Sequence, residues 1–161
     1  MARLPWGLVA LLMGLGWTTP VQATTWNRIA QFLQMIETTG VEAFVANDCP
    51  AGLLGAFHDS RQVILLCGNN LPDVPAPVWV VLAHESAHVM QSCKGGTLLP
   101  PALLSSGMDE ARRLQPDAFQ DLNLYHSGQH HVEAEARLVQ ALPPDQVVTL
   151  FQTHCASRLE R

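Results

Sequence analysis

The residues best suited to chemistry are two histidines and a glutamate within residues 84–88, whose sequence HESAH is an H-E-x-x-H motif. On a helix, His84 and His88 lie one turn apart on the same face, so both imidazoles can bind one metal ion. Glu85 adjoins the first histidine and can reach a water molecule on that ion. Zinc-dependent hydrolysis of a peptide bond requires this grouping of two nitrogen ligands, an acid–base carboxylate and an open coordination position.

The sequence around the motif predicts a helix over residues 77–92, most of whose other side chains are apolar. Pro75 and Pro77 lie just before it or in its first turn, where proline is tolerated, and Gly95 and Gly96 end it. Two histidines and a glutamate are costly to bury on such a helix unless they are paired or metal-bound. This favours a metal site over a chance match on a surface helix.

Hydrolytic zinc usually has three protein ligands, so we expect a third ligand on a later element. The extended metzincin motif is excluded, because Gln91 stands at its glycine position and Lys94 at its third histidine. Candidate donors instead cluster between residues 126 and 135: His126, His130, His131, Glu133 and Glu135.

Residues 133–136, with the sequence EAEA, fall in a helix predicted over residues 129–142. Together with the H-E-x-x-H helix and a preceding strand, they make residues 62–142 resemble the gluzincins, the zincin branch that includes thermolysin. The resemblance implies Zn²⁺ held by His84, His88 and Glu133, with Ala136 as the small residue beside the metal. Glu135 is the alternative third ligand. The family's aspartate after this motif, which commonly orients a ligand histidine, is replaced here by Arg137.

The resemblance further implies a zinc metallopeptidase that hydrolyses a peptide or protein substrate, with Glu85 as the general base. Candidate donors to the oxyanion are Tyr125, His126, His130 and His131. Residues 63–67 could form the edge strand that aligns an extended substrate, or a plain core strand. The alternative function, favoured by Arg137 and the small size, is an inactive zincin-like exported protein that binds metal or peptide. The chain also resembles small exported cyanobacterial proteins with similarly placed cysteines.

The first 23 residues have the features of a signal peptide. Arg3 precedes an apolar stretch over residues 4–17, and cleavage is predicted after Ala23. The apolar stretch is shorter than the roughly 20 residues of a membrane span, so no stable membrane anchor is expected after cleavage. We therefore expect one zincin-like domain over residues 24–161 in an exported protein, either periplasmic or secreted.

The charge and the cysteines bound the remaining possibilities. A formal net charge of −5 with no basic run argues against nucleic acid and anionic membrane surfaces as partners. The charged fraction of 14% is low and predicts some apolar surface, while oligomeric state stays open. Four cysteines in an exported small protein predict two disulfides. Of the three possible pairings, we favour Cys49–Cys67, which closes a hairpin, and Cys93–Cys155, which ties the H-E-x-x-H helix to the C-terminal helix.

The elements that must position these groups are mostly helices. Helices are predicted over residues 25–38, 107–115 and 144–157, in addition to the two named above, with a loop over residues 94–105. A β-hairpin is predicted from residues 53–57 and 63–67, around a turn at residues 58–61. The predicted fold class is therefore α+β, a mostly helical domain with one hairpin or small sheet packed on the H-E-x-x-H helix.

Overall fold

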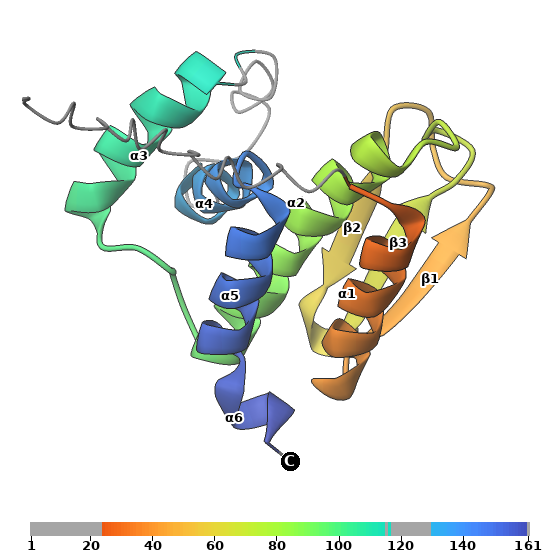
Figure 1. The fold of residues 1–161 in the computed structure, drawn as a ribbon, viewed down its shortest axis with the longest axis horizontal. Coiled ribbons are helices and arrows are strands. Elements are labelled where there is room, and N and C mark those ends of the chain that lie inside the picture. The colour runs from red at the N-terminus through yellow and green to blue at the C-terminus, as the bar shows by residue number, and fades with distance from the viewer. Residues whose placement is uncertain (1–23, 115, 117–129, 161) are drawn as a thin grey trace, which may run out of the picture.

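The computed structural model describes residues 24–114, 116 and 130–160, and these form an α+β fold, as predicted (Figure 1). The signal-peptide expectation for residues 1–23 lies outside the described residues. The N-terminal part consists of α1 (Trp26–Thr38), β1 (Glu42–Ala46), β2 (Gly55–His58), a 3₁₀ turn η1 (Asp59–Arg61) and β3 (Val63–Cys67). The helical part follows with α2 (Pro75–Lys94), α3 (Pro101–Leu114), α4 (His130–Gln140), α5 (Pro144–His154) and α6 (Ala156–Leu159).

The described strands form a three-stranded sheet in the order β1-β3-β2. Strands β2 and β3 are antiparallel, which confirms the predicted hairpin, and β1 pairs with β3 in parallel from Glu42 opposite Val63. Strand β1 was not predicted, because it pairs with residues about twenty positions later and three of its five residues are exposed. Of the two possibilities for residues 63–67, the structure has the core strand, since β3 lies in the centre of the described sheet and β2 is an edge.

Helix α2 is the element around which the described part of the chain is built. It packs against the sheet and α1 on one side and against α4 and α5 on the other (Figure 1). Its side chains Leu82 and Met90 are fully buried, and Trp79 packs against Phe32 of α1 with ring centroids 5.3 Å apart. Burial of each such side chain contributes roughly 1.5–3 kcal/mol, so α2 is held rigidly between two layers.

The ends of α2 follow the signals in the sequence. Val74 is extended, Pro75 opens the first turn, and Gly95 ends the helix in the left-handed conformation with φ 75°. The N–H of Gly95 donates to the carbonyl of Gln91, which satisfies one of the last carbonyl groups of the helix. The expected loop over residues 94–105 is partly wrong, because α3 already begins at Pro101, at a position where proline is well tolerated.

Both predicted disulfides are present. Cys49 is bonded to Cys67 at the end of β3, and Cys93 on α2 is bonded to Cys155 between α5 and α6. Two disulfides indicate an oxidising compartment. Among the described helices, none is both long and apolar enough to cross a membrane.

Loss of either disulfide should lower the free energy of unfolding, and the longer loop should matter more. Chain-entropy arguments give about 4 kcal/mol for Cys93–Cys155 and about 3 kcal/mol for Cys49–Cys67. Urea unfolding of the Cys93→Ser/Cys155→Ser and Cys49→Ser/Cys67→Ser variants measures both losses. A variant without Cys93 and Cys155 that is as stable as the wild type would contradict this expectation.

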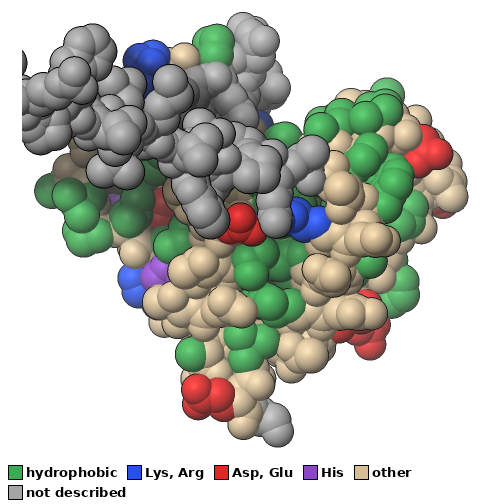
Figure 2. Space-filling view, viewed as in Figure 1, with side chains coloured by type: hydrophobic (Ala, Val, Ile, Leu, Met, Phe, Trp, Pro, Cys, Tyr) green, Lys and Arg blue, Asp and Glu red, His purple; other side chains and the backbone are tan. Residues whose placement is uncertain are grey.

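Large hydrophobic side chains are exposed on the part of the molecule that carries the sheet. They include Phe44 and Val45 on β1 and Leu53 and Leu54 before β2. Figure 2 shows hydrophobic side chains gathered on the surface at this end of the molecule. The apolar surface expected from the low charged fraction is therefore found at the sheet.

Candidate metal centre

Helices α2 and α4 bring His84, His88 and Glu133 together. Nε2 of His84 lies 3.4 Å from Oε2 of Glu133, and Nε2 of His88 lies 3.4 Å from Oε1 of the same carboxylate. One donor atom from each of the three residues lies within 4.8 Å of the other two. The three side chains are between 12% and 17% exposed, so the cluster is largely shielded but reachable from solvent.

The spacing of these atoms fits a metal ion better than it fits hydrogen bonds. Charge-assisted N–H···O bonds are about 2.7–2.9 Å long, shorter than both contacts of Glu133. Two ligands bound tetrahedrally to zinc at about 2.0–2.1 Å are themselves about 3.3 Å apart, which matches the separations found here. Oε2 of Glu133 is also buried without a hydrogen-bond partner in the described part of the chain. The three residues could therefore hold a divalent metal ion.

Two glutamines orient the histidines toward this cluster. Nδ1 of His84 lies 2.9 Å from Oε1 of Gln140, and Nδ1 of His88 lies 2.9 Å from Oε1 of Gln91. An amide oxygen only accepts, so each Nδ1 carries the proton and each Nε2 keeps its lone pair for a metal. A carboxylate commonly orients a ligand histidine, and here neutral amides occupy that position.

Neither glutamine was predicted as part of the site. Gln140 lies two helical turns after Glu133 on the same face of α4, and Gln91 lies one turn after His88 on α2. These spacings were a usable signal. Only the packing of α2 against α4 brings Gln140 to His84, and that packing was not predictable from either helix alone.

The two candidate glutamates on α4 face different partners. Glu133 contacts His84 and His88. Glu135 is 1% exposed and contacts the backbone of the residues that follow α2. Oε2 of Glu135 accepts from the N–H of Leu98 at 2.8 Å, and Oε1 accepts from the N–H of Leu99 at 2.7 Å. The carboxylate of Glu135 is thus occupied by backbone donors.

Glu85 is buried between α2 and β2. Burial raises its pKa, and the charge of Glu133 adds to this, while His84, His88 and the backbone of Phe57 act in the opposite direction. A carboxyl whose pKa is raised toward neutrality is better suited to take up and release a proton. Gly55 on β2 makes the space for this side chain, because a Cβ atom there would lie 2.6 Å from Val81 and 3.3 Å from Cγ of Glu85.

Burial and neighbouring charges shift the pKa values of Glu133 and His88 in opposite directions. Burial opposes the ionisation of Glu133, but the two imidazoles outweigh it and lower its pKa to about 2. Burial likewise lowers the pKa of His88, yet Glu133, Glu85 and Gln91 outweigh it and raise the pKa above its ordinary value. A cation placed among these groups would stabilise both carboxylates.

The expected oxyanion donors are only partly described. His130 is exposed at the start of α4, and Nε2 of His131 lies 3.4 Å from Oε1 of Glu135. Tyr125 and His126 lie outside the described residues. Nε of Arg137 is buried without a hydrogen-bond partner in the described ranges.

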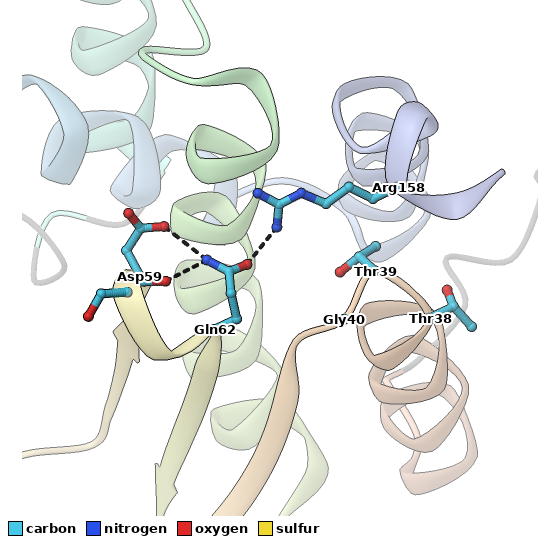
Figure 3. A pocket seen from close by; sticks show the side chains of 7 residues that line it. Thr38, Thr39, Gly40, Asp59, Gln62 and Arg158 are labelled. Carbon is cyan, nitrogen blue, oxygen red and sulfur yellow. Dashed lines mark hydrogen bonds between the residues drawn. The ribbon is translucent and has the colours of Figure 1, made fainter. Parts of the chain in front are cut away.

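A polar hollow of about 640 Å³ lies at the far end of α2 (Figure 3). Arg158 reaches from α6 to Oε1 of Gln62, and the amide of Gln62 donates to Asp59. Arg158 also donates to the carbonyl and hydroxyl of Ser92, near the end of α2. The members of the metal cluster do not line this hollow, and the hydrogen bonds of Gln62 and Arg158 to Ser92 link it to the C-terminal part of α2.

Comparison with known protein families gives no matching family model, and comparisons with curated proteins and with solved structures give no match. The candidate metal centre is therefore indicated by the chemistry and geometry of His84, Glu85, His88 and Glu133 alone.

Proposed function

We propose that this chain is an exported zinc-dependent metallopeptidase. The observation that carries the proposal is the convergence of His84, His88 and Glu133, with both Nε2 atoms turned toward one carboxylate and Glu85 beside them. Three protein ligands with an adjacent carboxylate are the arrangement of catalytic rather than structural zinc. A purely structural site would not need Glu85, whose burial costs free energy.

In this proposal each residue has a separate task. His84, His88 and Glu133 hold the metal, and Gln140 and Gln91 keep the imidazoles in the required tautomer. When bound, zinc supplies Lewis acidity, which acidifies water and polarises the scissile carbonyl. Glu85 takes the proton of the attacking water and delivers it to the leaving amine, a role for which its raised pKa suits it.

The position of β2 supports a peptide as the substrate. This strand is an edge of the sheet, and Gly55 places its backbone against α2 at Glu85. An extended peptide can pair with such an edge by main-chain hydrogen bonds. In this proposal strand β2, and not residues 63–67, is the edge strand that aligns an extended substrate.

An inactive zincin-like protein that binds metal or peptide is the second candidate. Arg137 in place of the family's aspartate favours it. The two candidates differ in turnover and not in metal content.

Zinc loading and peptide cleavage test the proposal together. Purified chain from residue 24 onward should bind one zinc and cleave unfolded protein or a peptide library. A chelator should abolish cleavage, and added zinc should restore it. A chain that holds one zinc yet cleaves no peptide would support the second candidate, and a chain that binds no zinc would overturn the metallopeptidase proposal.

Zinc binding should release a proton at neutral pH. The ligand form of His88 is neutral, and its pKa is raised above 6.5 in the metal-free chain, so the fraction of His88 that is protonated must lose its proton when the metal binds. Affinity should therefore rise with pH through and above 6.5 and level off once His88 is deprotonated. Calorimetry at pH 7 in buffers of different ionisation enthalpy counts the released protons. No proton release would contradict the pairing described here.

A further inference from the structure

Gln91 connects the metal cluster to a second carboxylate. Its Oε1 accepts from Nδ1–H of His88 at 2.9 Å, and its Nε2 donates to Oε2 of Glu135 at 2.9 Å. Nε2 also donates to the carbonyl of Val132 at 2.9 Å. Two acceptors on one side of the amide fix which end is nitrogen, so the oxygen must face His88.

Glu135 is the fixed end of this chain of hydrogen bonds. It is almost fully buried and is held by the N–H groups of Leu98 and Leu99, which follow α2. A buried carboxylate is costly unless it is well hydrogen-bonded, and here three of its bonds are shorter than 3.0 Å. Hydrogen bonds to a charged group are also the strongest and most directional of their kind.

The other ligand histidine has a simpler support. Gln140 accepts from His84 at 2.9 Å, but no described carboxylate accepts from its amide nitrogen. Among the described residues, His88 is linked through Gln91 and Glu135 to the backbone after α2, whereas His84 is linked through Gln140 to α4.

From this asymmetry we propose that Glu135 is a positioning residue of the metal centre, acting on His88 through Gln91. The proposal rests on the metal site proposed above. In this proposal Glu135 fixes the orientation of the Gln91 amide, and the amide fixes the ring of His88. The backbone at Leu98 and Leu99, which holds Glu135, therefore contributes to metal affinity. The residue that the sequence offered as a rival ligand thus supports the site without touching the metal.

A set of size-matched variants tests the link by zinc affinity, measured by competition with a chromophoric chelator. Glu135→Met removes the acceptors and should weaken zinc binding at least tenfold, since groups that orient ligands typically contribute 10- to 100-fold. Glu135→Gln keeps an acceptor for Gln91 and should recover at least threefold of that loss. The visible spectrum of the Co²⁺-loaded chain, which reports ligand geometry, should change in Glu135→Met and return toward wild type in Glu135→Gln.

The pathway through Gln91 is tested in two backgrounds. In Gln91→Met the link is already broken, so Glu135→Met should cause no further loss of affinity. In Gln140→Met, the matched control, Glu135→Met should keep its full effect. If Glu135→Met does not fold, Glu135→Asp, whose carboxylate is withdrawn by one methylene, takes its place in the same comparison, with an expected loss of at least threefold.

The outcomes separate this proposal from the one on which it rests. A wild-type chain that binds no zinc would remove the metal site itself. A wild-type chain that binds zinc, with Glu135 variants that lose folding stability but keep zinc affinity and the Co²⁺ spectrum, would show a structural role only. Equal losses in the Gln91→Met and Gln140→Met backgrounds would overturn the pathway through Gln91.

Discussion

Glu85→Gln should abolish most peptide hydrolysis while the chain still binds one zinc. The substitution keeps the size and hydrogen-bonding atoms of the side chain but removes its ability to take a proton. General acid–base groups contribute about 10²- to 10⁴-fold, so kcat should fall by that factor. None of the three metal ligands is altered, and zinc content measured by metal analysis should be unchanged.

The same substitution should not weaken the fold. Burial raises the pKa of Glu85, which means that its ionised form is disfavoured in the folded state and costs stability at neutral pH. Glutamine avoids that cost, so the metal-free variant should be at least as stable as the wild type in urea. A drop in activity with unchanged or raised stability is the signature of a residue retained for chemistry.

Glu37→Gln is the matched control, because Glu37 on α1 is exposed and undergoes the same chemical change. It should keep full activity. If Glu85→Gln hydrolysed peptides at the wild-type rate, the role of Glu85 as general base would be wrong even if the metal site were correct.

The parts of the fold that could be predicted from the sequence carry local signals. Helix α2 is marked by prolines at its start, a glycine at its end and apolar residues throughout, and it was located to within two residues at each end. The hairpin of β2 and β3 is marked by two apolar runs around a polar turn. Both disulfide pairings were favoured because one closes the predicted hairpin and the other ties the H-E-x-x-H helix to the C-terminal helix.

The parts that were missed depend on contacts between distant segments. Strand β1 is stabilised by parallel pairing with β3, and no local pattern near Phe44 predicts that pairing. Because β1 pairs with the free side of β3, β3 lies in the centre of the sheet and β2 is the edge strand beside Glu85. In the metal centre, the ligand types were readable from spacing, but the glutamines that orient them become visible only when α2 and α4 are packed together.

Glu133→Ala and Glu135→Ala should fail in different ways, although the two residues are only two positions apart. Loss of Glu133 removes a metal ligand, so zinc affinity should fall by more than about 100-fold, beyond the effect of losing an orienting group. The imidazoles lower the pKa of Glu133, so the metal-free fold loses their interaction with this carboxylate, but no buried backbone donor loses its acceptor. Activity should be lost together with zinc.

Loss of Glu135 should act mainly on the fold. It leaves the N–H groups of Leu98 and Leu99 and one N–H of the Gln91 amide without their acceptor in a buried region. Each unsatisfied buried donor costs about 1–3 kcal/mol, so the free energy of unfolding should fall by about 3 kcal/mol or more. The folded fraction should still bind one zinc at saturation, with reduced affinity.

Urea unfolding of the metal-free chains and zinc titration of both variants distinguish these two results. The reverse pattern, with zinc lost in Glu135→Ala and kept in Glu133→Ala, would move the third ligand to Glu135 and undo the geometry described here. The contrast is informative because two glutamates only two positions apart on one helix have different partners. One faces the histidines of α2, and the other fastens the chain that leaves α2.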